Sequence, residues 1–470
     1  MTDDETPWMR LLRELFGDDA DEALAELQRM GMDPQALAQA SGMSASPAMM
    51  DHVLRQIRTL LSQGDGQDVN WQLAHDVARG VAAQGGDPTV SAAVASEHRA
   101  VVSEAELWLD AATDLDPSRL EPRVWSRAEW VEATLPTWRS LAGPVAVSVS
   151  QALGGVLGRE LAASDDPDDP TNALLGEQGR AMLSSVSPTV CGMHVGQAAG
   201  EMAREAFGAT DLGIPLLAEA RVAIVPHAVE EFARGLEGVD EREVKAFLAL
   251  REAAHVRLFQ AAPWLQAKLH SLIERYSQGI AIDADALDEA VRDAGVGDPA
   301  KLQKALTRGI FAPEHSEEQT ATLESIETLL ALVEGWVQDV TMRAAAPHLA
   351  SLSQLGEMMR RRRAAGGPAE DTFATLLGLE LRPRRMRDAA AMWASLASKA
   401  GPSARDEVWS HPDLLPTATD LEDWSAWVER RVSGDQEDEM DRELEKLLGG
   451  GADDAGGDDA GGEPDPDTDR

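Results

Sequence analysis

Residues 239–259 read VDEREVKAFLALREAAHVRLF, and this stretch decides the fold. Asp240, with Glu243 three positions later, resembles a capping box, a pattern that begins many helices. Pro263 lies just beyond the stretch and marks its end, because proline cannot continue a helix interior. We therefore predict one helix over about 241–261.

The motif Arg251-Glu252-Ala253-Ala254-His255 lies within this helix. A zinc peptidase helix reads His-Glu-x-x-His: both histidines bind one Zn²⁺, and the glutamate activates the metal-bound water. Here the first histidine is Arg251, which cannot be a ligand because its guanidinium stays protonated. Glu-x-x-His is common in ordinary helices, so this motif does not define a zinc site by itself.

Further stretches extend the pattern along the chain. They are Asp211-Leu212-Gly213-Ile214-Pro215-Leu216, Gln260-Ala261-Ala262-Pro263-Trp264-Leu265, Leu329-Leu330-Ala331-Leu332-Val333-Glu334-Gly335-Trp336-Val337-Gln338-Asp339 and Trp409-Ser410-His411-Pro412-Asp413-Leu414-Leu415-Pro416. Together with residues 251–255 they resemble an actinobacterial family of zincin-like metallopeptidases, often described only as hydrolases. The resemblance spans roughly residues 65–420. It implies a mostly helical zincin-like fold, with Glu252 as general base, His255 as a zinc ligand and Glu334 as the downstream carboxylate ligand.

Arg251 departs from that family pattern. A peptidase zinc needs three protein ligands and one open position, and His255 with Glu334 supplies two. A guanidinium at position 251 could take the place of the cation and pair with Glu334 or Glu252. The resemblance implies a zinc cofactor, and Arg251 argues against it. We therefore expect an atypical or catalytically inactive member of the family.

Two alternatives stay open. The chain could be an active zinc-dependent metallopeptidase that completes its site with another ligand, for which His270 and Glu274 are candidates. It could instead be a non-enzymatic interaction protein that binds a protein or peptide partner through its acidic tail and an anion-binding patch. The arginines of that patch are Arg360, Arg361, Arg362, Arg363, Arg382, Arg384, Arg385 and Arg387. Under any of these readings, we expect Trp264 and Trp336 to line the cleft.

The domain organisation follows from composition. An apolar content of 43% is enough for a large core, and strict strand alternation is scarce, residues 222–226 being the best strand candidate. We predict a mainly α fold, a zincin-like multi-helix domain with at most a small β element. That domain covers 49–432, between a mobile N-terminal region with short helices (1–48) and an acidic, largely disordered tail (433–470).

Charge and cysteine content exclude several classes of protein. There are 82 acidic and 42 basic residues, a net charge of −40, which disfavours binding to nucleic acid or to an anionic membrane. The single cysteine excludes an intramolecular disulfide. The N-terminus has no basic, apolar secretory signal, so we expect a cytoplasmic protein. The oligomeric state is left open.

Overall fold

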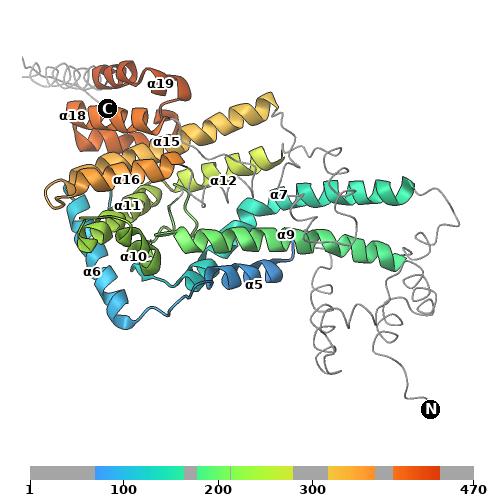
Figure 1. Ribbon diagram of the computed structural model, residues 1–470. Helices are drawn as coiled ribbons and strands as arrows, with labels where there is room; N and C mark the ends of the chain where they lie inside the picture. Colours follow the sequence, from blue (N-terminus) through green and yellow to red (C-terminus); the bar gives the residue numbers. More distant parts are fainter. Residues whose placement is uncertain (1–68, 164–176, 212, 279–315, 366–384, 435–470) are drawn as a thin grey trace, which may run out of the picture.

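The computed structural model describes residues 69–163, 177–211, 213–278, 316–365 and 385–434 (Figure 1). Of this part of the chain 75% is helical, and its only strands are two short parallel ones. The predicted mainly α fold with a small β element is therefore confirmed. The predicted N-terminal region 1–48 and the tail from residue 435 onward lie outside the described residues.

Helix α11 (Glu241–Ala261) is the buried element at the middle of the fold (Figure 1). Its bounds are those predicted, but its cap differs. Asp240 accepts a hydrogen bond from the Arg242 amide, 2.9 Å away, whereas Glu243 accepts one from the Ser351 amide. The capping box is not formed, because Glu243 holds Ser351, the residue directly before the helix Leu352–Ala365. Every residue from Ala246 to Phe259 is buried.

Five helices pack around α11 or extend its layer. They are α6 (Ala92–Leu109), α10 (Pro226–Arg234), α12 (Pro263–Gln278), α15 (Glu317–Ala345) and α16 (Leu352–Ala365). Helix α15 also packs against α18 (Met386–Glu407). After α18 the chain forms two 3₁₀ turns, η2 (Val408–Ser410) and η3 (Pro412–Leu414), and then α19 (Ala418–Glu422). The core thus lies between α11 and the α15–α18 layer.

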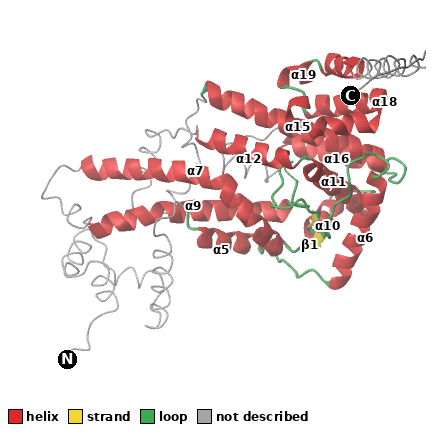
Figure 2. Ribbon diagram, turned by 180° about the vertical axis from the view of Figure 1, so that it is seen from behind, coloured by secondary structure: helices red, strands yellow, loops and turns green. Residues whose placement is uncertain are grey.

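A second group of helices extends away from this core (Figures 1 and 2). Helices α7 (Arg127–Ala163) and α9 (Glu177–Glu205) run side by side, and α5 (Trp71–Ala82) packs on α9. Three glycines of α9 face α5, where a Cβ would come within 2.7 Å of its backbone or side chains: Gly192, Gly196 and Gly200. Among the described helices, none is long and apolar enough to cross a membrane.

The small sheet positions the loop that reaches the candidate site. Strand β1 (Arg123–Val124) pairs in parallel with β2 (Ala223–Ile224), within the predicted strand segment (Figure 2). Directly after β2, the Val225 amide donates to the Phe207 carbonyl over 2.8 Å. This bond fixes the start of the loop 206–216, which we call the site loop, beside α11.

Candidate functional site

Glu252 of α11 is fully enclosed and faces the site loop. One carboxylate oxygen accepts from the Ala209 amide at 2.9 Å, and the other from the Thr210 hydroxyl at 2.5 Å. The Ala223 amide of β2 lies 3.4 Å away and adds a third donor. Burial raises the pKa of Glu252 above its ordinary value, although these hydrogen bonds act in the opposite direction. The carboxyl group thus holds the site loop and β2 against α11.

Two glycines let the site loop approach the acidic side chains this closely. A Cβ on Gly208 would lie 2.4 Å from the Glu252 carboxyl group and 2.7 Å from the Ala223 carbonyl oxygen. Gly213 has a positive φ of 73°, and a Cβ there would lie 3.1 Å from Glu334 Oε1. The loop therefore touches Glu252 with one end and Glu334 with the other.

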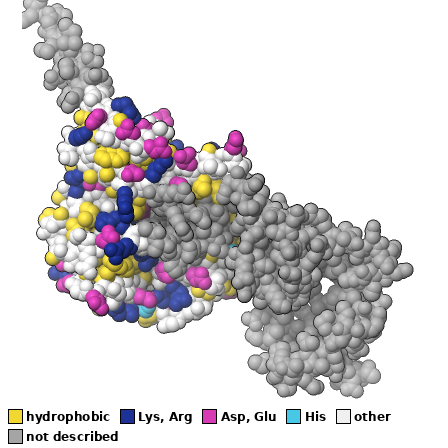
Figure 3. Space-filling model, turned by 45° about the horizontal axis from the view of Figure 1, so that its top comes forward, with side chains coloured by type: hydrophobic (Ala, Val, Ile, Leu, Met, Phe, Trp, Pro, Cys, Tyr) yellow, Lys and Arg dark blue, Asp and Glu magenta, His cyan; other side chains and the backbone are white. Residues whose placement is uncertain are grey.

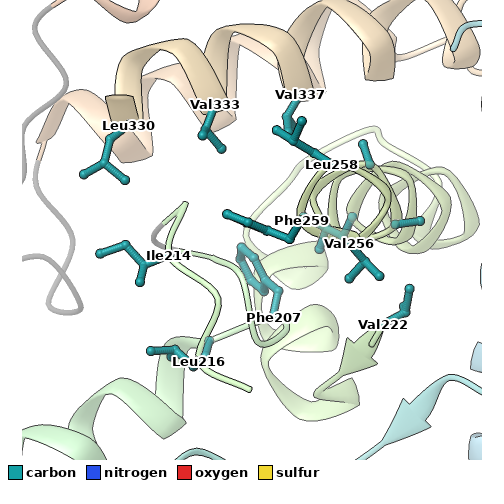
Figure 4. Close-up of a cluster of buried hydrophobic side chains, with 14 of the residues drawn as sticks. Phe207, Ile214, Leu216, Val222, Val256, Leu258, Phe259, Leu330, Val333 and Val337 are labelled. Carbon is teal, nitrogen blue, oxygen red and sulfur yellow. The ribbon is translucent and has the colours of Figure 1, made fainter. Parts of the chain in front are cut away.

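Apolar side chains of and around the site loop fill the space between α11 and α15. Figure 4 shows Ile214 and Leu216 in the same buried cluster as Phe207, with Phe259 of α11 between Phe207 and α15. Each of these side chains is at most 5% exposed. Between α11 and α15 the site loop is part of the hydrophobic core, and none of its residues lines the pocket beside Arg251.

Arg251, His255 and Glu334 form one buried cluster. Arg251 Nη2 donates to Glu334 Oε2 over 2.6 Å, and His255 Nε2 lies 3.0 Å from Glu334 Oε1. The Glu334 side chain is 1% exposed, that of His255 3% and that of Arg251 10%. Of the two carboxylates considered as partners for Arg251, the structure brings it to Glu334. Both Glu334 oxygens are thus occupied by side chains of α11.

The His255 ring is oriented by its own helix. Its Nδ1 lies 2.9 Å from the Arg251 carbonyl oxygen, which can only accept, so Nδ1 carries the hydrogen. This leaves Nε2 directed at Glu334. A histidine that binds a metal through Nε2 is held in the same way, by an Nδ1–H bond to a carbonyl. The ring orientation of His255 therefore suits a metal ligand. The place where a metal ion would lie, in front of Nε2, is taken by the Glu334 carboxylate.

The space beside this cluster is small. The pocket next to Arg251 and Glu334 leaves only about 10 Å³ for the centres of water molecules, room for about one water. Small-molecule sites measure roughly 300–1,000 Å³. Other lining residues are Phe247, Gln338, Thr341, Met342, Gly356, Met359, Arg360 and Met386. This pocket is too small for a peptide.

The two predicted cleft tryptophans do not line this pocket. Trp336 is fully buried, and its indole N–H donates to Asp406 over 2.9 Å, because it projects from α15 towards α18 and away from Glu334. Trp264 is half-buried and donates to the Trp409 carbonyl oxygen. Both tryptophans contact other helices through these bonds, and neither is among the residues that line the pocket beside Arg251.

Most of the described arginines of the predicted anion patch have partners within the protein. Arg360 and Arg361 both bind Glu357 of their own helix, and Arg385 binds Glu422. Arg362 donates to the Glu205 carbonyl oxygen, and Arg387 is exposed. Arg382, Arg384 and the side chain of Arg363 lie outside the described part. Figure 3 likewise shows basic and acidic side chains interspersed on the face it presents.

The other metal-ligand candidates are not gathered at the site. Glu274 is exposed, and His270 is half-buried with its Nε2 without a hydrogen-bond partner. Burial lowers the pKa of His270. Within the described ranges, no group of three or more histidine, cysteine, aspartate or glutamate side chains is placed to hold a metal ion.

Sequence reasoning missed Gly208 and Thr210, which contact Glu252 through the site loop. The neighbouring segment 211–216 had been singled out for its resemblance to a family pattern, but neither Gly208 nor Thr210 belongs to it. No local signal identifies them, because a hydroxyl or a glycine in a loop acquires this role only when the loop meets a helix 42 residues further along the chain.

Comparison with known proteins identifies the family. The family model described as zincin-like metallopeptidase matches residues 69–428, most of the chain. The chain therefore belongs to the zincin-like metallopeptidase family, which confirms the resemblance read from the sequence. None of the curated proteins matches the sequence.

One solved structure shares the fold. It is described as "a putative hydrolase with a novel fold" from Chloroflexus aurantiacus. The two chains superpose with a TM-score of 0.51 and are 19% identical, over 77% of this chain and 98% of the other. At this identity the likeness concerns the fold and carries no residue roles.

The residues present do not fit a peptidase zinc. Such a site needs three protein ligands and an open fourth position. Both Glu334 oxygens face Arg251 and His255, and a fixed positive charge at Arg251 would repel a dication at this place. Glu252 gives both of its oxygens to the site loop. We therefore derive no chemical step through a metal.

Proposed function

We propose that this chain is an atypical member of its family, in which Arg251 replaces the first zinc-ligand histidine and ordinary zinc peptidase chemistry is lost. The observation that carries the proposal is the 2.6 Å bond between Arg251 and Glu334. The guanidinium supplies the positive charge that a carboxylate ligand would otherwise receive from the metal. The pair keeps the cluster compact without a Lewis acid.

The proposal gives this cluster a structural role. A buried carboxylate without a partner is costly, and removing one partner of a buried pair destabilises a protein by about 3–5 kcal/mol. Glu334 projects from the middle of α15 and would be stranded without Arg251 and His255. The cluster thus fastens α15 to α11, an architectural role that needs no substrate.

Glu252 supports the same conclusion. A general base must reach the attacking water within about 2.6–3.2 Å. Both of its oxygens already accept from the site loop, and the site loop is packed into the core. We propose that Glu252 positions the site loop and that the chain acts as a binding or scaffold protein. The patch-and-tail alternative has less support, because the described patch arginines mostly bind the protein's own carboxylates and carbonyls.

Metal content tests the proposal. We would purify wild type, Arg251→His and Arg251→Gln without chelator and measure zinc per chain by mass spectrometry. Wild type and Arg251→Gln are expected to hold no stoichiometric zinc. Arg251→His is expected to bind about one, because two histidines one helical turn apart and Glu334 would complete three ligands. Arg251→Gln removes the charge without adding a ligand and is the matched control.

Peptidase assays complete the test. Because Glu252 is engaged by the site loop, we expect zinc-loaded Arg251→His to leave casein intact. About one zinc per wild-type chain, together with casein cleavage that a chelator abolishes, would overturn the proposal. It would establish instead an active metallopeptidase with an unrecognised ligand.

A further inference from the structure

A second hollow, lined in part by Phe207, shares no lining residue with the pocket beside Arg251. It has about 460 Å³ available to the centres of water molecules. It lies between the start of α7, the end of α9, α10 and the end of α16. This volume is within the roughly 300–1,000 Å³ range of small-molecule sites. Among the hollows that the described residues line, this one offers far more room than the pocket beside Arg251.

Three arginines line the hollow, and two of them are held by the protein. Arg127 Nη2 donates to the Arg204 carbonyl oxygen at 3.1 Å and to Glu231 at 3.2 Å. Arg362 Nη2 donates to the Glu205 carbonyl oxygen at 3.1 Å, and its guanidinium lies over the Phe207 ring. These bonds satisfy carbonyls at the end of α9 and fix both guanidinium groups in place.

Among the described residues, the Arg204 side chain and the Nε of Arg127 have N–H donors that are not used. In the described part of the chain, the Arg204 side chain makes no hydrogen bond or ion pair. Arg127 is 3% exposed, and its Nε is buried without a hydrogen-bond partner. Burial, and the nearby positive charge of Arg204, lower the pKa of Arg127. Two guanidinium groups close together with spare N–H donors are a typical arrangement for an oxyanion.

The carboxylates of the hollow are already engaged. Glu231 accepts from Arg127, Glu205 lies 3.8 Å from Arg362, and Glu201 accepts from Gln197 at 2.5 Å. The unused capacity of the lining is therefore mainly that of N–H donors. The lining carries three arginines and three glutamates, so its charges are balanced in a chain whose net charge is −40.

The hollow also has an apolar wall. Phe207 and Phe232 meet edge to face, with ring centroids 5.1 Å apart, and both line it. A bare inorganic anion would fill only a small part of 460 Å³. A ligand that fits the whole hollow carries an anionic group for the arginines and an uncharged, apolar part for the two rings.

We propose that this hollow binds a small organic anion, whose phosphate or carboxylate group is held by Arg204 beside the guanidinium group of Arg127. The uncharged part of the ligand lies against Phe207 and Phe232. The site is independent of the metal question, because none of its residues belongs to the Arg251 cluster. It gives the protein a ligand of its own, whatever the outcome of the zinc measurement.

The test uses the full chain and three probes: inorganic phosphate, phenyl phosphate and benzoate. Binding would be followed by isothermal titration calorimetry at constant ionic strength. We expect saturable binding of at least one aromatic probe, tighter than that of inorganic phosphate. A preference for phenyl phosphate would indicate a phosphorylated ligand, and a preference for benzoate a carboxylated one.

Arg204→Gln is the decisive variant. It should weaken binding about tenfold or more, since a hydrogen bond to a charged group contributes about 1.5–3 kcal/mol. It should leave the melting temperature nearly unchanged, because Arg204 holds nothing together. Arg234→Gln, which removes an exposed arginine of α10 outside the hollow, carries the same charge change and should bind like wild type.

Two results would overturn the proposal. The first is the absence of saturable binding of all three probes to the wild-type chain. The second is equal binding by Arg204→Gln and Arg234→Gln, whether both are weakened or both unchanged. Equal weakening would mean that only the general charge of the protein attracts anions, and unchanged binding in both would mean that Arg204 does not hold the ligand.

Discussion

The two ends of the site loop hold two buried glutamates in different ways. At one end Glu334 faces two side chains that can carry positive charge, Arg251 and His255. At the other end Glu252 is surrounded by neutral donors, two backbone amides and the Thr210 hydroxyl. Neutral donors compensate burial only in part, so the pKa of Glu252 is raised.

This difference separates two structural roles. A carboxylate that faces a permanent cation is an electrostatic anchor, and the whole cost of its burial returns when the partner is lost. A carboxylate among neutral donors fixes the position of the loop, because the loop donors must lie within hydrogen-bond distance of its oxygens. Here the anchor joins two helices, α11 and α15, and the geometric contact joins a loop to a helix.

The largest effect is expected at the anchor. Glu334→Met leaves the Arg251 guanidinium buried without its carboxylate, and we expect a loss of about 3–5 kcal/mol in unfolding free energy. The double variant Arg251→Met, Glu334→Met should recover most of that loss, because apolar side chains of similar volume can replace a buried pair. Denaturant unfolding of wild type, both single variants and the double variant gives the coupling energy. Additive losses would show that the pair is not an anchor.

A smaller effect is expected at the loop contact. Gly208→Ala places a Cβ 2.4 Å from the Glu252 carboxyl group, and overpacking of this kind costs about 1–3 kcal/mol. The matched control is Gly80→Ala in α5, where nothing lies within 4 Å of the added Cβ. That change should be neutral or stabilising, since alanine favours a helix over glycine. Equal thermal stability of the two variants would contradict the packing described for the site loop.

The smallest expected effect concerns pH. The folded-state pKa of Glu252 lies above its ordinary value of 4.5, so the folded state binds the proton more tightly than the unfolded chain does. Its contribution to stability is complete below pH 4.5 and is lost as pH rises through the folded-state pKa. Glu252→Gln keeps the shape without titrating, so its stability relative to wild type should increase with pH over that window. Asp211 and His255, which also act electrostatically on Glu252, remain in both proteins.

Denaturant unfolding at several pH values measures this difference. Glu334→Gln, made in parallel, is the comparison at the other end of the loop. It removes the charge beside Arg251 and should cost stability at neutral pH, where Glu252→Gln should not. If the unfolding free energies of both variants depend on pH in the same way, the two glutamates are not held differently and the prediction is contradicted.

Sequence by itself determined the helical class, the bounds of α11 and the family. These features depend on short-range patterns: the helix limits at Asp240 and Pro263, the scarcity of strand alternation, and motifs within a few residues of each other. The chemistry of Arg251 was also readable, because a guanidinium cannot be a metal ligand in any fold.

Only the tertiary structure decided which groups meet. Arg251 and Glu334 are 83 residues apart in the chain, and their contact depends on how α15 packs on α11. Packing likewise directed Glu252 to the site loop and buried Trp336 against Asp406. Within the described residues, it left the donors of Arg204 unused beside a hollow. A local pattern specifies which side chains share one face of a helix. Which other element packs on that face depends on the volume and polarity of all the side chains in the core, and no short stretch of sequence contains that information.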